Sequence, residues 1–250
     1  MKKIIDNFSI QSNDYKKYRP EYPEALINEI LKYVPTKNNC LDCGTGNGQL
    51  ASKLSNHFKN TLAVDISINQ LKVAGNSKNL CYIVARSEQT PFRYGLFDLI
   101  TIAQAIHWFD LQKFREEIIR LSVDNGVLAL IGYGLVKIDI EIDKVINDFY
   151  INTMGKYWDS ERRLVENEYD EIDLNLEYII PKKYFFLRTK WSVQELFGYL
   201  NSWSSVQKYI NQNGDNPVSL LENKISHAWS RNQIKIVKFP LFLKLYSIKK

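Results

Sequence analysis

The sequence lacks the features that mark several classes of protein. No stretch approaches the roughly 18 apolar residues of a membrane span, and the basic start at residues 1–7 is not followed by the apolar segment of a secretory signal. Lys and Arg form no long run, whereas a nucleic-acid-binding surface needs clustered basic residues. We therefore expect a cytoplasmic globular protein with neither a membrane nor a nucleic-acid partner.

Cysteine is also scarce, because the chain has only Cys40, Cys43 and Cys81. The C-x-x-C spacing of the first two is compatible with half a zinc site or a redox pair. There is no second C-x-x-C and no nearby histidine pair to complete a zinc site, and the two cysteines flank an apolar strand that runs into a glycine loop. We expect both to be small buried apolar residues and no metal to be bound.

What the chain does contain is ordinary for a globular protein. Hydrophobic residues make up 45% and charged residues 24% of its 250 residues. This length fits one large α/β domain, or one domain with an appended cap. The net charge of +5 favours small anionic substrates weakly, through electrostatic steering, but an AT-rich genome that encodes many lysines would produce the same charge.

Apolar strands and helices alternate through the first half of the sequence. Continuous apolar strands between amphipathic helices indicate a parallel sheet that is covered on both faces. The strands are expected at 40–43, 61–65, 80–85, 97–103 and 126–132, and the helices at 24–31, 48–58, 68–74 and 111–121.

The pattern changes after Gly134. A helix is expected near 142–153, followed by an irregular segment at 155–178 that is rich in charged and aromatic residues. A strand at 184–188, a helix after the capping box of Ser192 to Glu195, and a helix from Asn216 follow. The last strand, 234–245, is expected to be antiparallel, and bent or at an edge because of Pro240.

The strongest motif is the glycine-rich loop that follows the first strand. Gly44, Gly46 and Gly48 have the spacing G-x-G-x-G rather than the G-x-G-x-x-G of dinucleotide-binding loops. Glycines allow a positive φ and a close backbone approach to a ligand, and the following helix offers free N–H groups. The loop therefore predicts a ligand-binding turn, although a tight turn without a ligand would have the same glycines.

Two acidic residues point to the kind of ligand. Asp42 would repel a pyrophosphate but could pair with an ammonium group. Asp65 ends the next strand, about 20 residues on, where a carboxylate can accept from both ribose hydroxyls. A ligand with an α-amino acid at one end and a nucleoside at the other fits this pair. Nicotinamide-dependent oxidation is a weaker alternative, because the glycine spacing and Asp42 both oppose it.

Four segments resemble motifs of the class I methyltransferases that use S-adenosylmethionine. Residues 41–50 resemble their first motif, and Asp65 to Ser67 their second-strand motif. Ser87 to Phe92 resembles the Ala-Glu-x-x-Pro-Phe segment, and residues 97–100 the fourth-strand motif. Residues 15–23 and 103–110, together with cap segments at 157–163 and 198–207, are also similar to the trans-aconitate methyltransferase-like group.

The resemblance implies a site for S-adenosylmethionine, with S-adenosylhomocysteine as its product. Many relatives carry Asp or Ser where Arg86 stands, and Arg cannot accept from the adenine amino group. Backbone groups would have to take over that contact. The implied cofactor-binding residues are Tyr18, Arg19, Asp42, Gly44, Thr45, Gly46, Gly48, Asp65, Ile66, Ser87, Glu88 and Gln104.

The acceptor side of the expected site centres on Gln104 and His107, which are the candidate catalytic residues. His107 could act as a base for a phenol or carbon acid, or it could hydrogen-bond its neighbours and shape the pocket. Arg162 or Arg163 could clamp a substrate carboxylate, or both could be solvated surface charges. The candidate aromatic walls of the pocket, which could equally be core residues, are Trp108, Tyr157, Trp158 and Trp203.

These observations predict a doubly wound, mostly parallel, seven-stranded Rossmann-like sheet with an antiparallel C-terminal strand. Its expected parts are an N-terminal lid helix (1–35), a cofactor-binding core (36–135), a helical substrate cap (136–181) and the remaining core (182–250). The expected reaction is methylation of a small anionic acceptor at a carboxylate. Methylation of a carbon or phenol in a quinone-like or natural-product acceptor, and cofactor binding without turnover, remain alternatives. The sequence leaves the oligomeric state open.

Overall fold

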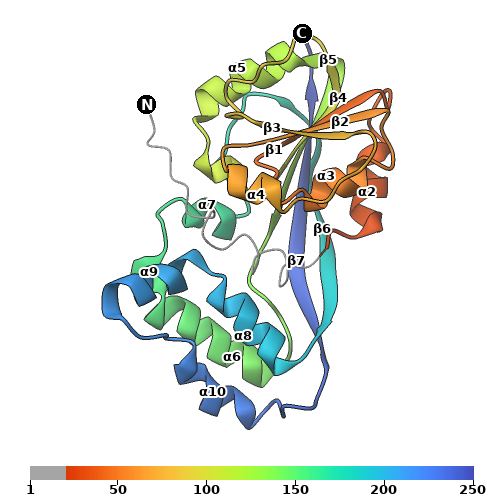
Figure 1. The fold of residues 1–250 in the computed structure, drawn as a ribbon. Coiled ribbons are helices and arrows are strands. Elements are labelled where there is room, and N and C mark those ends of the chain that lie inside the picture. The colour runs from red at the N-terminus through yellow and green to blue at the C-terminus, as the bar shows by residue number, and fades with distance from the viewer. Residues whose placement is uncertain (1–20) are drawn as a thin grey trace.

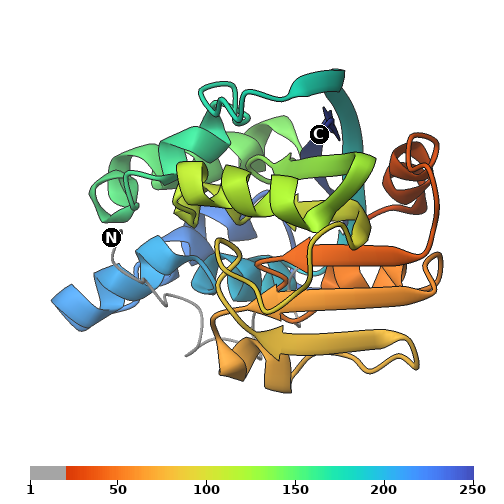
Figure 2. The same ribbon diagram turned by 90° about the horizontal axis from the view of Figure 1, so that it is seen from above.

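Residues 21–250 are described by the computed structural model, and within them seven strands form a single sheet. The strand order is β3-β2-β1-β4-β5-β7-β6, and β1 to β5 are mutually parallel (Figures 1 and 2). The strands are β1 (Asn39–Cys43), β2 (Asn60–Asp65), β3 (Leu80–Val84), β4 (Phe97–Ala103), β5 (Ser122–Tyr133), β6 (Glu177–Trp191) and β7 (Lys235–Ile248). The predicted doubly wound α/β fold is confirmed.

Helices cover both faces of the sheet because successive residues of a strand point to opposite sides. In β1, Cys40 packs with α2 (Glu24–Leu31) and α3 (Gln49–Leu54), whereas Leu41 packs with α5 (Leu111–Leu121) on the other face. Segment 165–174 adds the buried side chains of Tyr169, Ile172 and Leu174 to this second layer. A short helix, α4 (Ile68–Lys72), follows β2.

The remaining helices gather beyond one end of the sheet (Figure 1). They arise from two places in the chain, after β5 and between β6 and β7, and we call this group the cap. Stacking of Phe149 on Trp203, with ring centroids 6.2 Å apart, joins the two sets. The cap contains α6 (Ile140–Asp148), η3 (Phe149–Thr153), η4 (Gly155–Tyr157), α8 (Val193–Asn201), α9 (Ser204–Asn213) and α10 (Ser219–Ser226), with α7 (Arg162–Glu166) between it and the core.

Pro240 predicts that the last strand is bent or lies at an edge of the sheet. The edge position is wrong. β7 lies between β5 and β6 and is antiparallel to both. The carbonyl of Pro240 accepts from the amide of Gly134 at 2.8 Å, so the missing N–H of Pro240 faces the same side. The β5 ladder has already ended there, at the Tyr133–Leu241 pair, and the proline therefore removes no ladder bond.

β6 is longer than the predicted strand at 184–188, and its last part leaves the main sheet. From Phe186 to Trp191 it pairs with Pro240 to Lys235 of β7, past the end of the β5 ladder. This two-stranded arm reaches into the cap (Figure 1). The predicted capping box is present at its end, where Ser192 and Glu195 start α8. None of the helices described here has the length and apolarity that crossing a membrane requires.

Candidate active site

The glycine loop lies at the carboxyl end of β1, the edge of a parallel sheet where ligands bind in open α/β folds. All three glycines have positive φ, +63° at Gly44, +56° at Gly46 and +77° at Gly48. Gly48 is also the N-cap of α3. The amide of Thr45 donates to the carbonyl of Val64 at 3.0 Å, which ties the loop to β2. The chain therefore turns sharply over the strand ends.

The three glycines differ in what surrounds them. A Cβ at Gly44 would lie 2.6 Å from the Cβ of Ala105, and one at Gly48 would clash with the hydroxyl of Tyr82. At Gly46 the nearest atom is the Oε1 of Gln70, 3.9 Å away. Two glycines thus permit close packing within the protein, whereas Gly46 borders open space.

Asp42 lies beneath the loop and is 2% exposed. Its Oδ1 accepts from the hydroxyl of Thr101 and its Oδ2 from that of Thr45, both at 2.6 Å. Burial raises the pKa of Asp42 to about 6, and the nearby charge of Asp65 adds to this, although the threonine hydrogen bonds act in the opposite direction. Asp42 therefore holds the loop on β4 from inside the protein.

Asp65 ends β2 beside the glycine loop. Its Oδ2 accepts from the amide of Gly46 and its Oδ1 from the amide of Ser67, each at 2.8 Å. Because a carboxylate oxygen can accept more than one hydrogen bond, both oxygens can also accept from a ligand. The two acidic positions that the sequence singled out lie together, at the ends of neighbouring strands.

The next strand ends bring three more expected residues to the same edge. Ile66 is 41% exposed, so its apolar surface faces outward. Ser87 is buried and its side chain hydrogen-bonds to Cys43. Glu88 accepts from Arg86 at 3.2 Å and from the amide of Asp110 at 3.0 Å. Arg86 is therefore engaged by an acid of its own segment.

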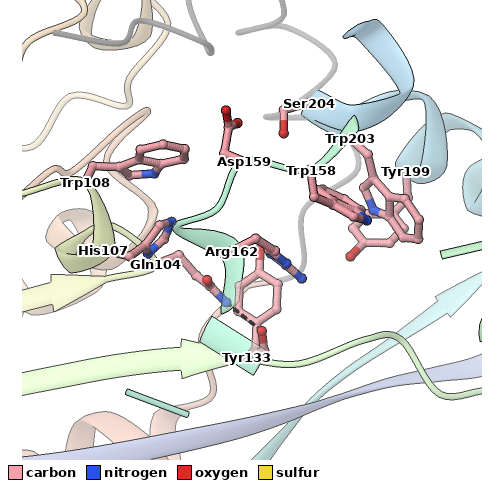
Figure 3. Close-up of a pocket in the computed structure, with 10 residues that line it drawn as sticks. All are labelled: Gln104, His107, Trp108, Tyr133, Trp158, Asp159, Arg162, Tyr199, Trp203 and Ser204. Atoms are coloured by element: carbon pink, nitrogen blue, oxygen red, sulfur yellow. Dashed lines mark hydrogen bonds between the residues drawn. The ribbon is translucent and has the colours of Figure 1, made fainter. Parts of the chain in front are cut away.

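A pocket lies between the end of β4 and the cap (Figure 3). The core contributes one side of it and the cap helices the other, with Arg162 between the two groups of side chains. Within the part of the chain that the structure describes, its lining residues are Gln104, His107, Trp108, Tyr133, Trp158, Asp159, Arg162, Tyr199, Trp203 and Ser204. Six of the predicted site residues are thus brought together here.

Gln104 follows the last residue of β4 and has a positive φ of 56°. A non-glycine residue in this region is strained by an amount on the order of 1–3 kcal/mol. Two hydrogen bonds hold it there: its amide donates to Ile131 at 2.9 Å, and its Nε2 donates to the carbonyl of Tyr133 at 2.7 Å. The side chain is fixed at the tip of the strand (Figure 3).

Arg162 forms part of an aromatic cluster in the cap. Its guanidinium lies 5.1 Å from the ring centroid of Trp158, and its Nε donates to the hydroxyl of Tyr150 at 2.9 Å. That hydroxyl in turn donates to Glu166, and burial raises the pKa of Tyr150 to about 12. Arg162 therefore presents a positive charge to the pocket from a stacked, hydrogen-bonded position.

Other expected residues lie away from the pocket. Arg163 is 68% exposed at its side chain and pairs with Glu171 at 2.7 Å. Tyr157 is buried against Tyr209, with ring centroids 5.0 Å apart, and does not line the pocket. The lid residues Tyr18 and Arg19 fall outside the described residues. Cys40 and Cys43 are buried, as expected, and burial raises the pKa of both thiols.

Sequence reasoning missed four lining residues and one that supports the pocket. Tyr133, Asp159, Tyr199 and Ser204 line the space, and the hydroxyl of Tyr169 lies 3.1 Å from the Nδ1 of His107. Tyr133 could have been found, because it directly follows an apolar strand at the edge where ligands bind. Asp159, Tyr199 and Ser204 lie in the cap segments at 157–163 and 198–207, where the resemblance could have pointed to them, and only Tyr169 lies in a segment without a signal.

Comparisons with known proteins agree with this geometry. Residues 41–130 match a family model described as a methyltransferase domain. A Dictyostelium discoideum protein named as a methyltransferase is 31% identical over 96% of this chain and 94% of its own length. The S-adenosylmethionine-dependent methyltransferase CRG1 of Saccharomyces cerevisiae is 24% identical, with 84% of each chain covered.

Solved structures show the same fold. A type II methyltransferase structure from Anaeromyxobacter dehalogenans is 29% identical and superposes with a TM-score of 0.86, covering 93% of this chain and 99% of that one. The YcgJ protein of Bacillus subtilis, at 18% identity and a TM-score of 0.51, shares the fold. With its G-x-G-x-G loop at the carboxyl end of β1, the chain belongs to the methyltransferase-domain family and is an S-adenosylmethionine-dependent methyltransferase.

Proposed function

We propose that this methyltransferase methylates a carboxylate of a small molecule that binds between the end of β4 and the cap. The observation that carries the proposal is the position of Arg162, a guanidinium that lines the pocket within an aromatic cluster. A planar guanidinium favours planar, bidentate recognition of a carboxylate. A carboxylate is already ionised at neutral pH, so its methylation needs no base.

The residues at the strand ends fit the cofactor. The open space beside Gly46 admits the close approach of a ligand, and Asp65 has oxygens that can accept from ribose hydroxyls. When bound, S-adenosylmethionine supplies a methyl carbon that is electrophilic because of its sulfonium. The part of the protein is to align the acceptor with that carbon, and alignment is worth roughly 7–11 kcal/mol of a barrier.

The carboxylates and neighbouring side chains have separate roles in this proposal. Asp42 fixes the loop and places negative charge beneath the amino-acid end of the cofactor, instead of meeting its ammonium group directly. The exposed Ile66 packs on the adenine, with Ser87 beside its edge. Because Arg86 and Glu88 bind each other, backbone groups near Ser87 recognise the adenine amino group.

On the acceptor side, Gln104 forms the floor beneath the transferring methyl, held by its hydrogen bonds to β5. The walls are Trp108 from the core and Trp158 and Trp203 from the cap. Asp159 would repel an anion, but it pairs with Lys208 at 2.5 Å, which offsets its charge. We assign substrate binding to the cap as a whole and the chain to the trans-aconitate methyltransferase-like subgroup.

A product screen tests the proposal. Calorimetry with S-adenosylhomocysteine first establishes cofactor binding. Mono-, di- and tricarboxylic acids are then incubated with S-adenosylmethionine beside phenols and amines, and products are identified by mass spectrometry. Methyl esters are the expected products. Methylated phenols or carbon acids without any ester would overturn the carboxylate assignment, and cofactor binding with no product across the panel would favour a binding module.

A second candidate, methylation of a phenol or carbon acid, has one observation in its favour. His107 lines the pocket and could receive a proton from such an acceptor. The pH dependence of the rate separates the candidates. A phenol or carbon acid requires the unprotonated imidazole and loses rate as pH falls through the histidine pKa, whereas a carboxylate acceptor shows no such loss.

A further inference from the structure

Tyr169 contacts His107 but does not itself line the pocket. The phenol oxygen lies 3.1 Å from the Nδ1 of His107, and the two rings are stacked with centroids 6.0 Å apart. Tyr169 is fully buried and packs edge-on against Phe242, with centroids 5.3 Å apart. His107 is itself 6% exposed and lines the pocket. One ring nitrogen is thus engaged inside the protein.

The backbone that carries Tyr169 adopts an unusual conformation. Glu168 and Tyr169 both have positive φ, 51° and 60°, where α7 ends with the amide of Tyr169 donating to Leu164 at 2.8 Å. Helices usually use a single glycine for such an ending, and two consecutive larger residues are strained. Such strain persists only where the surroundings hold it.

Ion pairs on either side of Tyr169 supply that hold. Glu168 accepts from the hydroxyl of Tyr184 at 2.8 Å and pairs with Lys182 at 2.9 Å. Asp170 pairs with Lys182 at 2.8 Å and with the almost fully buried Lys244 at 2.6 Å. These contacts therefore fasten the turn to β6 and β7. The fastened turn keeps the Tyr169 phenol in a fixed position against His107.

We propose that Tyr169 is a positioning residue that holds His107 in the Nε2–H tautomer, an inference that rests on the proposed function. A neutral phenol donates its O–H to the unprotonated Nδ1, and the hydrogen bond at one ring nitrogen decides which nitrogen carries the proton. His107 then presents an N–H to the acceptor. A donor beside Arg162 complements a carboxylate, and an Nε2 that already carries its proton cannot take another from a phenol.

Nitrogen-15 NMR of the histidine rings tests this assignment directly, without an acceptor. The spectrum is recorded on the full chain at about pH 8, above the ordinary histidine pKa, and His107→Gln identifies the signals among those of the three histidines. The expected result is a protonated Nε2 and an unprotonated Nδ1 in the wild type. A through-hydrogen-bond coupling from the Tyr169 hydroxyl proton to Nδ1 is also expected.

Tyr169→Phe removes only the hydroxyl and is expected to shift the tautomer ratio of His107 toward an even mixture. Tyr94→Phe, at a 66% exposed tyrosine, is the matched control and leaves the ratio unchanged. A wild-type Nδ1–H form, or an unchanged ratio in folded Tyr169→Phe, overturns the proposal. If Tyr169→Phe does not fold, the tautomer and the coupling measured in the wild type test the proposal. An absent coupling then overturns it.

The product screen, run on the same samples, separates this inference from the function on which it rests. A chain that forms no methyl ester, yet shows the Nε2–H tautomer, contradicts the carboxylate function and leaves the histidine assignment standing. A chain that forms methyl esters and shows the Nδ1–H tautomer contradicts the histidine assignment alone.

Discussion

The Oδ2 of Asp65 accepts a hydrogen bond from the backbone amide of Gly46, 2.8 Å away. A carboxylate from one strand end thus fixes the loop that follows the neighbouring strand. The contact orients the carboxylate and the turn relative to each other. Preorganisation of this kind reduces the cost of binding.

Asp65→Asn tests the ribose contact. The substitution keeps the size of the side chain but removes the charge and one acceptor, so we expect S-adenosylhomocysteine to bind about 10- to 100-fold more weakly, the loss of one charge-assisted hydrogen bond. Calorimetry measures the change. Asp124→Asn, at an exposed position near the start of β5, is the control. Equal affinity in the wild type and Asp65→Asn would remove the carboxylate from the cofactor site.

Gly46→Ala and Gly214→Ala compare the same backbone strain inside and outside the site. Both glycines have positive φ, +56° and +84°, and an added methyl group meets little in either place. Each substitution should lower the free energy of unfolding by about 1–2 kcal/mol. Only Gly46→Ala should weaken S-adenosylhomocysteine binding, because only its methyl group enters the space assigned to the cofactor. Urea unfolding and calorimetry measure the two effects, and equal affinities would contradict the assignment.

Arg162→Lys and Arg163→Lys separate two adjacent arginines. Lysine keeps the charge but not the planar fork, and only Arg162 lines the pocket. With the carboxylate acceptor found by the product screen, we expect Arg162→Lys to lower kcat/KM by about 10- to 100-fold, mainly through KM. Arg163→Lys should remain within about twofold, since an exposed ion pair contributes little. Similar losses in both variants would count against the clamp.

Asp42 gives the stability of the protein a specific pH dependence. Because burial raises its pKa from 3.8 to about 6, the folded state binds the proton more tightly than the unfolded state does. Its stabilising contribution is therefore complete below about pH 4 and is lost as pH rises through about 6. The loss corresponds to about 3 kcal/mol. Urea unfolding between these pH values measures it.

Asp42→Asn is the matching control, because it cannot titrate. As pH rises from about 4 to 7, the free energy of unfolding of the variant should increase relative to that of the wild type, while all other groups titrate alike in both. A difference that does not change with pH would mean that the Asp42 carboxyl ionises normally despite its burial.

Sequence patterns predicted the parallel part of the sheet because its strands are short, mainly apolar runs between amphipathic helices. They underestimated β6, because Pro181 and the charged Lys182 and Lys183 interrupt the apolar pattern before residue 184. Pro240 suggested an edge strand because a proline cannot donate a ladder hydrogen bond. Whether a bond is lost depends on which neighbouring strand its missing N–H faces, and the sequence does not show this.

The candidate site shows the same division. The glycine loop and Asp65 were predictable because their spacing is a direct consequence of how strands end. Arg162 and Arg163 were indistinguishable in the sequence, since only the packing of α7 turns one toward Trp158 and the other toward Glu171. Tyr169 depends on two strained backbone angles and had no signal at all.

Phe239 belongs to the two-stranded arm and contacts both walls of the pocket. Its ring centroid lies 5.7 Å from that of Tyr133 in the core and 5.2 Å from that of Tyr199 in the cap. One ring thus sets the spacing between a wall that the sheet holds and a wall that α8 carries. Exchanges in the cap helices can therefore reshape one wall of the pocket, while the parallel strands, to which we assign the methyl donor, stay unaltered.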